Sequence, residues 1–295
     1  MTYDVLLPGF SLRLSNFLEC FLLSTWSWKI DPWKSKAILN FSEKNTVQLL
    51  QETTPDIVLE SFPVVCIEKI GFFERRVYQL PANETLWEYV RVCEKRAYLR
   101  FKVSPNWDKI TLLTDITETK GCVAFEYLAQ IMPGVCLKHD LLTFHSALVE
   151  YRGKAFAVCA DSGTGKTTHA RLWRDCKNAL ILNGDRTVCG RTEGRWTAYG
   201  TPWSGSSGEQ INRSAPLEAL VLLERSEVNY IQCLSGLEAF QALMPHLLYP
   251  SWDAELVGRA MELMDDLLAN VRIYRLGCRP DSESVEVLCQ AIFKE

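Results

Sequence analysis

The sequence predicts an α/β protein, in which a domain built around a phosphate-binding loop follows a smaller α+β region. Two observations predict it. A glycine-rich loop at 160–168 stands between a short apolar run at 154–159 and a segment with helical apolar spacing at 167–174. Beyond this loop, short apolar runs and longer amphipathic segments continue to the end of the chain, which is typical of strands and helices packed in layers. We therefore expect an N-terminal region over 1–120 and a nucleotide-binding domain over 121–295.

The N-terminal region is expected to contain mixed strands and short helices, without a recognisable site. Strand-like segments lie at 56–60, 76–80, 98–103 and 107–113. Tryptophans occur at 26, 28, 33 and 87. Side chains of this kind are usually core, and a substrate-lining groove is the alternative.

The elements of the second region follow from apolar spacing and from helix-stop residues. A helix is expected over 123–132, ending at Pro133 and Gly134, and strands over 141–151 and 154–159 lead into the loop. After the loop helix, strands are expected at 179–182, 187–189, 196–199, 216–223, 230–234 and 272–276. Helices are expected at 237–248, 255–271 and 284–293.

The loop has the spacing of a phosphate-binding loop: a small residue, four residues, Gly, Lys and a hydroxyl residue. The expected nucleotide-binding residues are Ala160, Asp161, Ser162, Gly163, Thr164, Gly165, Lys166, Thr167 and Thr168. Glycines let the backbone turn so that successive N–H groups point at phosphate oxygens. Lys166 supplies a point charge for the β- and γ-phosphates, and the Thr167 hydroxyl can bind Mg²⁺. Ala160 stands where glycine is usual, which requires that its φ is not positive.

Phosphoryl transfer also needs a carboxylate and compensating cations. Asp185 follows the apolar run 179–182 after Asn183 and Gly184, and it is the expected second Mg²⁺ ligand, the alternative being an ordinary turn aspartate. Arg186 and Arg213 are the other local cations that could neutralise the transferring group. We expect Arg213 to reach the γ-phosphate, with an exposed loop arginine as the alternative. His145 precedes the loop on the strand 141–151, and taken alone it is expected to be a core histidine, with a catalytic role as the alternative.

Composition limits the partners. The 295 residues carry a net charge of −4, with 47% hydrophobic and 23% charged residues. This balance offers no basic surface for nucleic acid or an anionic membrane, and no apolar run is long enough to span a bilayer. The eleven cysteines contain no Cys-x-x-Cys pair, and several lie within apolar runs. Reduced thiols in a cytoplasmic protein are therefore expected.

Three segments of the chain resemble the HPr kinase/phosphorylase and phosphoenolpyruvate carboxykinase group of P-loop proteins. They are Phe144-His145-Ser146-Ala147, Ser162-Gly163-Thr164-Gly165-Lys166-Thr167-Thr168 and Asn183-Gly184-Asp185. A longer string over 168–173, 183–186 and 199–205 is similar to bacterial HPr-kinase-like proteins, some of them encoded beside peptide-modification enzymes. The likeness covers roughly residues 120–295 and is weak before them.

The resemblance implies a mixed sheet, ATP or GTP with Mg²⁺ as cofactors, and His145 at the reacting phosphate or its metal. The group carries an aspartate pair after the second strand, which supplies the metal contact and the base. Here the first member is Gly184, so Asp185 alone carries over and the identity of the base stays open. Family members often assemble, so the resemblance also admits a homo-oligomer.

The favoured function is an ATP-dependent phosphotransferase that moves the γ-phosphoryl group to a hydroxyl, expected to be a serine, of a peptide or protein. A ribosomally made precursor peptide is one such acceptor. The Gly/Ser-rich loop at 204–208 would border the acceptor. Two alternatives remain, a carboxykinase-like or small-molecule kinase and a non-catalytic nucleotide-binding regulator. His145 and Asp185 disfavour the regulator, since binding alone needs neither.

Overall fold

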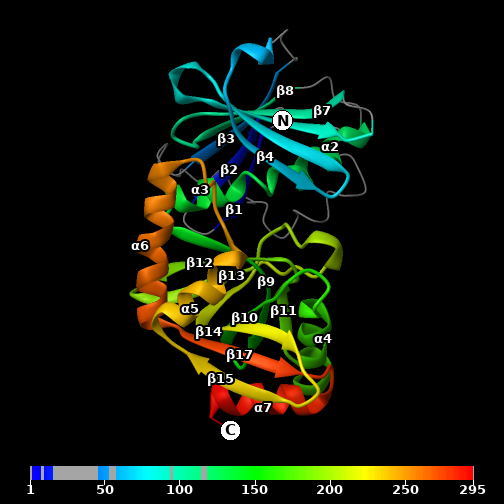
Figure 1. Ribbon diagram of the computed structural model, residues 1–295, viewed down its shortest axis with the longest axis vertical. Coiled ribbons are helices and arrows are strands. Elements are labelled where there is room, and N and C mark those ends of the chain that lie inside the picture. Colours follow the sequence, from blue (N-terminus) through cyan, green and yellow to red (C-terminus); the bar gives the residue numbers. More distant parts are fainter. Residues whose placement is uncertain are drawn as a thin grey trace. The chain divides into compact units, whose positions relative to one another are not determined.

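The computed structural model describes residues 2–7, 10–15, 46–52, 58–93, 96–113 and 118–294. The chain divides into two compact units, Met1–Lys138 and His139–Glu295. Each unit contains a mixed sheet with helices, so the mixed α/β class predicted from the sequence is present (Figure 1). The sequence places the boundary at 120/121, whereas the structure assigns residues 121–138 to the first unit.

The described part of the first unit forms an eight-stranded sheet in the order β1-β2-β3-β8-β7-β6-β5-β4. Its elements are β1 (Thr2–Leu7), β2 (Phe10–Ser15), β3 (Thr46–Glu52), η4 (Leu59–Ser61), β4 (Val64–Ile70), β5 (Phe73–Gln79), η5 (Pro81–Asn83), β6 (Thr85–Arg91), β7 (Arg96–Val103), β8 (Lys109–Leu113), α2 (Glu118–Leu128) and α3 (Met132–Lys138). The pairs β2–β3 and β3–β8 are parallel, and the remaining neighbours are antiparallel.

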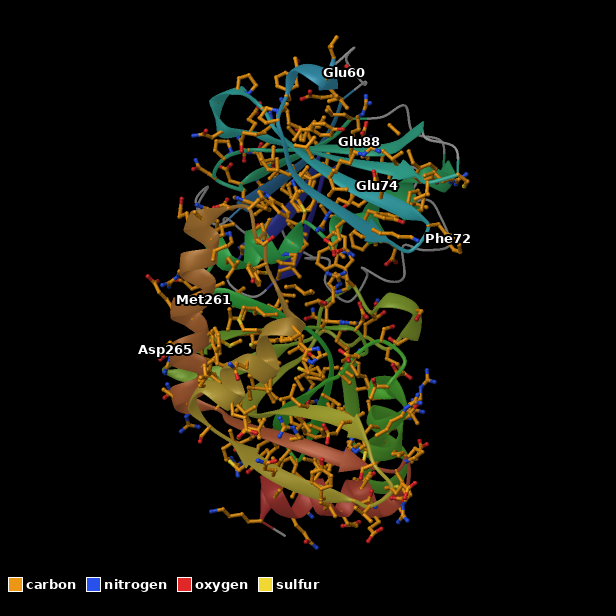
Figure 2. The ribbon with its side chains drawn as sticks, viewed as in Figure 1. Glu60, Phe72, Glu74, Glu88, Met261 and Asp265 are labelled. Carbon is orange, nitrogen blue, oxygen red and sulfur yellow. The ribbon has the colours of Figure 1, made fainter. Side chains whose placement is uncertain are left out.

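Neighbouring residues of β6 point to opposite faces of this sheet, and both faces are buried along the strand. Trp87 and Tyr89 are buried, which confirms the core assignment for Trp87, while the other three tryptophans lie outside the described residues. Glu88 points to the other face and is still only 4% exposed. Arg100 Nε and Nη2 donate to its Oε1 at 2.9 and 2.8 Å, so the buried carboxylate is paired. Phe72, at the tip of the β4–β5 hairpin, is 86% exposed (Figure 2).

The second unit contains a nine-stranded mixed sheet within the described residues. Its elements are β9 (Leu141–Tyr151), β10 (Lys154–Cys159), α4 (Lys166–Lys177), β11 (Leu180–Asn183), β12 (Arg186–Thr192), β13 (Arg195–Tyr199), η6 (Gly205–Ser207), β14 (Ser214–Arg225), β15 (Tyr230–Leu234), α5 (Gly236–Leu243), η7 (Met244–His246), β16 (Leu247–Leu248), α6 (Ala254–Asn270), β17 (Arg272–Cys278) and α7 (Ser282–Phe293).

Two long strands organise this sheet. Residues 141–145 of β9 pair with β12, and residues 146–151 pair with β10. Strand β14 pairs with β13 at its start and with β10 and β17 further along, and both of the latter pairings are parallel. The antiparallel pairs β9–β10 and β15–β17 make the sheet mixed, as expected. The carboxyl ends of β10, β14 and β17 therefore lie at one edge, where ligands of such sheets bind.

Helices α4 and α7 cover one face of this sheet. Phe156 and Val158 of β10 and Val221 of β14 belong to one core with Trp173 of α4 and Val285 of α7. Figure 1 shows α4 beside β11, and α7 beyond β15. Alternate residues of β10 and β14 consequently point to the opposite face.

Three predicted elements differ from the structure, two of them at prolines. Met132, Pro133 and Gly134 begin α3 instead of ending a helix, because proline is tolerated in a first turn, where its missing N–H is not needed. The helix expected over 237–248 ends at Leu243; Pro245 follows in η7, and β16 comes next. Residues 59–60, expected to be extended, begin η4, and 56–57 lie outside the described residues.

None of the helices among the described residues is long and apolar enough to cross a membrane.

Candidate active site

The glycine-rich loop joins the end of β10 to the start of α4, in the order predicted. Gly163 has φ +78° and Gly165 has φ +126°, so both positions use backbone conformations that favour glycine. Ala160 is not among the residues with positive φ, which satisfies the condition set by its side chain. Helix α4 begins after Gly165 without a side-chain cap. The backbone N–H groups of its first turn are therefore not satisfied by a capping side chain.

Lys166, the first residue of α4, folds back over the loop. Its Nζ donates a hydrogen bond to the Ala160 carbonyl oxygen at 2.7 Å, and the residue is 8% exposed. Burial lowers the pKa of Lys166, while the negative charges of Asp185 and Asp161 oppose this shift. The next residue, Thr167, is partly exposed. A buried amino group thus lies at the loop, with Asp185 close enough to act on it.

Asp185 and His145 come together at the junction of β9 and β12. Arg186 pairs with His145 in the register of these strands, and Ser146 N–H donates to the Asp185 carbonyl oxygen at 3.0 Å. His145 Nε2 lies 3.4 Å from Asp185 Oδ1, and Arg186 Nε lies 3.5 Å from Asp185 Oδ2. Burial opposes ionisation of Asp185, but the hydrogen bond from His145 and the charges of Arg186 and Lys166 outweigh it and lower the pKa of this carboxyl. The carboxylate is therefore ionised at neutral pH.

The residues at the loop suit a magnesium ion that arrives with a nucleotide. The described residues contain no group of three His, Cys, Asp or Glu side chains able to hold a metal by themselves. Mg²⁺ takes oxygen ligands and usually keeps several waters, with one or two carboxylates and the phosphates of a substrate completing its shell. The Thr167 hydroxyl and the Asp185 carboxylate are oxygen donors of the required kind.

Asn183 holds the turn that carries Asp185. It is fully buried, and its Nδ2 donates to Thr201 O, Thr201 Oγ1 and Trp203 O at 2.9, 3.0 and 3.1 Å. Its Oδ1 accepts from the backbone N–H groups of Asp185 and Arg186 at 2.8 and 2.7 Å. One side chain thus fixes both the Asp185 turn and the segment that leads to the Gly/Ser-rich loop.

Replacing Asn183 with alanine is expected to lower the free energy of unfolding by about 3 kcal/mol or more, because several buried polar groups lose their partner at once. Urea unfolding followed by far-ultraviolet circular dichroism measures this loss. Asn270→Ala is the matched control, since Asn270 also bonds through Nδ2, to Asp266, but at the exposed end of α6. Equal losses in the two variants would mean that the Asn183 network is not structural.

The Gly/Ser-rich loop lies directly against Asp185. A Cβ atom on Gly205 would stand 2.7 Å from Asp185 Cγ, and Gly205 has φ +56°, so this position excludes side chains for two reasons. A Cβ on Gly184 would collide with Ser207 Oγ. That hydroxyl donates to Ser204 O at 2.6 Å and accepts from the backbone N–H of residue 209 at 3.2 Å. The space beside Gly184 is thus filled by an anchored serine.

Arg213 does not reach the glycine-rich loop. Its Nη2 donates to Glu150 Oε1 at 2.7 Å, and Glu150 pairs with Ala155 near the start of β10, whereas the loop follows the end of β10. Because β14 runs parallel to β10, a residue that precedes β14 lies at the starting end of both strands. The expectation that Arg213 contacts a γ-phosphate is wrong for this reason.

Arg225 is a cation at the loop that sequence reasoning missed. It is the last residue of β14, and its Nη2 donates to the Gly163 carbonyl oxygen at 2.7 Å. The sequence holds the corresponding signal, an arginine at the end of a buried strand. That signal could be used only with the knowledge that this strand runs parallel to the one before the loop.

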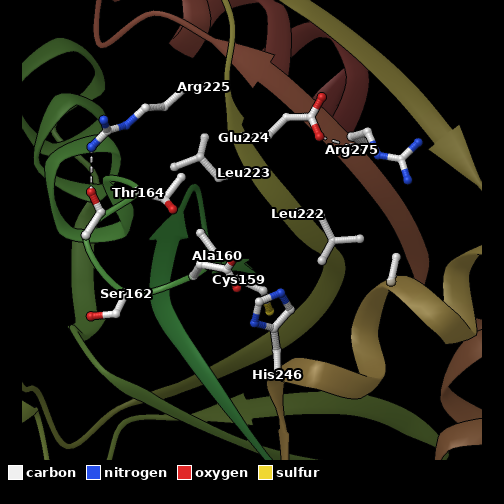
Figure 3. Close-up of a pocket in the computed structure, with 13 residues that line it drawn as sticks. Cys159, Ala160, Ser162, Thr164, Leu222, Leu223, Glu224, Arg225, His246 and Arg275 are labelled. Atoms are coloured by element: carbon white, nitrogen blue, oxygen red, sulfur yellow. Dashed lines mark hydrogen bonds and ion pairs between the residues drawn. The ribbon is translucent and has the colours of Figure 1, made fainter. Parts of the chain in front are cut away.

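A pocket of about 610 Å³ opens between the loop and the carboxyl ends of β14 and β17 (Figure 3). Its lining comprises residues 159–164 and 222–225 together with Ala242, His246 and Arg275. Sequence reasoning also missed His246, which lies within a segment expected to be helical. The pocket has the size of small-ligand sites, and its lining is rich in polar and charged groups.

The chain matches no known protein-family model and no curated protein. Among solved structures it has a weak likeness to the Hpr(Ser) kinase/phosphatase from Coxiella burnetii, at 6% identity and a TM-score of 0.32. That match covers 52% of this chain and 97% of the other. A likeness of this size supports no conclusion about function, which has to be argued from the residues.

Proposed function

We propose that the second unit binds a nucleoside triphosphate, ATP or GTP, with Mg²⁺ at residues 160–168. It then transfers the γ-phosphoryl group to a hydroxyl, expected to be a serine, of a peptide or protein. The observation that carries the proposal is the convergence of three features where β10 ends. These are the uncapped start of α4 with Lys166, the ionised Asp185 and the adjoining His145. Phosphoryl transfer requires groups of these kinds.

Each group has a distinct task in the proposed reaction. The backbone N–H groups of the loop and Lys166 bind the phosphates. The Thr167 hydroxyl and Asp185 would hold Mg²⁺, which neutralises charge on the phosphate oxygens when it is bound. The acceptor oxygen attacks the γ-phosphorus, the bond to the β–γ bridging oxygen breaks, and the nucleoside diphosphate leaves. The proton of the acceptor passes to Asp185 or to His145.

The surroundings of Asp185 support an acceptor at the Gly/Ser-rich loop. The Asp185 carboxyl occupies the space that a Cβ on Gly205 would need, so it lies directly beside this loop, and its side chain is 28% exposed. A hydroxyl-bearing segment that rests on this loop would therefore meet the carboxylate. This supports a peptide or protein as the acceptor.

Calorimetric binding of ATP and GTP with Mg²⁺, followed by transfer from γ-labelled nucleotide to a library of serine-containing peptides, tests the proposal. The expected result is saturable binding and label on a serine. Binding without transfer to any peptide would favour the nucleotide-binding regulator, and a protein that binds neither nucleotide would overturn the proposal.

His145→Gln is expected to slow transfer by about 10²-fold or more, as loss of a general base or of its orienting partner does. Nucleotide affinity and melting temperature should stay close to those of the unaltered protein, because the His145 side chain is 36% exposed and contacts a carboxylate rather than a core. Single-turnover rates and thermal melts measure the two quantities. An unchanged rate, or an unfolded variant, would make His145 an ordinary structural histidine.

A further inference from the structure

His246 is the second histidine at the edge of the sheet where β10 ends. It closes η7 and directly precedes β16, in which Leu247 pairs with Phe144 of β9. This pairing brings His246 near His145, although the two residues are far apart in the sequence. His246 also lines the pocket together with the glycine-rich loop (Figure 3).

His246 approaches the loop from the face opposite α4. Neighbouring residues of a strand point to opposite faces. Val158 and Val221 belong to the core under α4 and α7, so Cys159 and Leu222 point away from those helices. The pocket lies on their side, where His246 completes its lining (Figure 3).

The imidazole of His246 belongs to a residue that is only 8% exposed. Within the described part of the chain, its ring nitrogens have no hydrogen-bond partner. Figure 3 shows the ring directed at Cys159 and Ala160. The ring nitrogens are not among the fully buried polar atoms that lack a partner, so they are open to the pocket, where a ligand or water can complete their hydrogen bonds.

Three charged or titratable groups act on this ring. Burial lowers the pKa of His246, Asp161 opposes the shift, and Lys166 and His145 add to it. The ring is therefore neutral at pH 7 and carries one N–H donor and one acceptor. Arg225, Arg275 and Glu224 are the other charged residues of the pocket lining. A neutral donor close to Lys166 suits a phosphate oxygen, which accepts hydrogen bonds.

We propose that His246 binds the terminal phosphate of the nucleotide by donating a ring N–H to one of its oxygens. The phosphate would then be held from two faces of the sheet, by Lys166 and α4 on one and by His246 on the other. This inference rests on the proposed function, because it requires the triphosphate to lie at 160–168. It adds a binding residue that the loop motif does not contain.

The test compares ATP and ADP. His246→Leu keeps roughly the volume of the ring and removes the donor, so Mg·ATP should bind about 10- to 100-fold more weakly, as expected for a lost hydrogen bond to a charged group. ADP affinity should change by less than about threefold, because ADP lacks the terminal phosphate. His246→Asn and His246→Gln should recover part of the lost Mg·ATP affinity. Their amide groups place an N–H donor near the position of ring Nδ1 or Nε2, respectively. Calorimetry measures each dissociation constant.

His139→Leu is the matched control, since the charge that acts on His139 is that of Asp140 rather than a group of the loop. It should bind both nucleotides as the unaltered protein does.

A second measurement uses the unaltered protein, so it does not depend on the folding of a His246 variant. The chain has four histidines, and the ¹⁵N resonances of His246 should shift on adding Mg·ATP and stay in place with Mg·ADP.

The outcomes separate the two proposals. Equal losses for ATP and ADP, an unchanged ATP affinity in His246→Leu, or a His246 resonance insensitive to ATP would each overturn the terminal-phosphate contact while leaving nucleotide binding intact. An unaltered protein that binds neither nucleotide would overturn the proposed function and this inference with it.

Discussion

Lys166→Ala is expected to reduce phosphoryl transfer by about 10³-fold, because it removes a fixed positive charge from the place where charge builds up on the transferring phosphate. Nucleotide affinity should fall as well, since the same charge also acts on the bound triphosphate. Initial rates with saturating Mg·ATP and calorimetric dissociation constants separate the two effects.

The stability of a variant at this position is informative because Lys166 is buried. The pKa of Lys166 is lowered in the folded protein, so the unfolded chain binds more protons at this residue. Burial of the charged amino group therefore lowers the stability of the fold at neutral pH. This cost disappears once the pH rises past the ordinary lysine pKa of 10.5. Lys166→Met keeps the aliphatic stem and removes the charge. We expect this variant to melt at or above the temperature of the unaltered protein at pH 7, while transfer is lost.

Loss of transfer together with unfolding in both variants would assign Lys166 a structural role through its bond to the Ala160 carbonyl oxygen. Normal transfer in a folded Lys166→Met would contradict the site assignment itself. Lys177→Met is a suitable control, because Lys177 lies at the other end of α4 and pairs with Glu286 of α7.

Local patterns allowed part of this site to be predicted from the sequence. The glycine-rich loop combines residues that act through their own backbone and side chains over a few positions, so spacing alone locates Gly163, Gly165 and Lys166. The flanking strand and helix are equally local. Asp185 follows an apolar run, and the structure brings it to His145.

The site residues that could not be predicted from the sequence are those whose positions depend on how the strands pair. Arg213 directly precedes β14 and Arg225 ends it, and only the parallel pairing of β14 with β10 decides which of them meets the loop. His246 is placed by a helix that ends before Pro245 and by a two-residue strand that pairs with β9. Neither pairing leaves a periodic pattern in the sequence.

The same limit applies to the fold. Strand β4 is largely exposed on both faces and β6 is buried on both, so neither shows the alternation that indicates a half-buried strand. Gly184 gives a further example. In the sequence, Gly184 stands where the proteins that the chain resembles carry the first aspartate of a pair. In the structure, the side chain of Ser207 occupies the space beside Gly184, where a longer side chain would lie.

Asp185→Asn is expected to remove transfer almost completely, by about 10³-fold or more, while nucleotide binding stays measurable. The substitution keeps the shape of the side chain and deletes the charge proposed to hold Mg²⁺ and to meet the acceptor proton. A charge that acts mainly in the transition state lowers kcat rather than affinity alone. Initial rates across a magnesium titration measure this, and Asp266→Asn, an aspartate of α6 paired with Arg191, is the matched control.

The pH dependence of stability gives an independent check on the same residue. The pKa of Asp185 is lowered below its ordinary value of 3.8, so its ionised form stabilises the fold fully above that value, and the contribution is lost as the pH falls through the lower folded-state pKa. Asp185→Asn should therefore melt below the unaltered protein at neutral pH, and the gap should close in acid. A variant that transfers phosphate normally at every magnesium concentration would make Asp185 ordinary turn structure. If the difference in melting temperature between Asp185→Asn and the unaltered protein stayed the same in strong acid, Asp185 would stabilise the fold through packing and not through its charge.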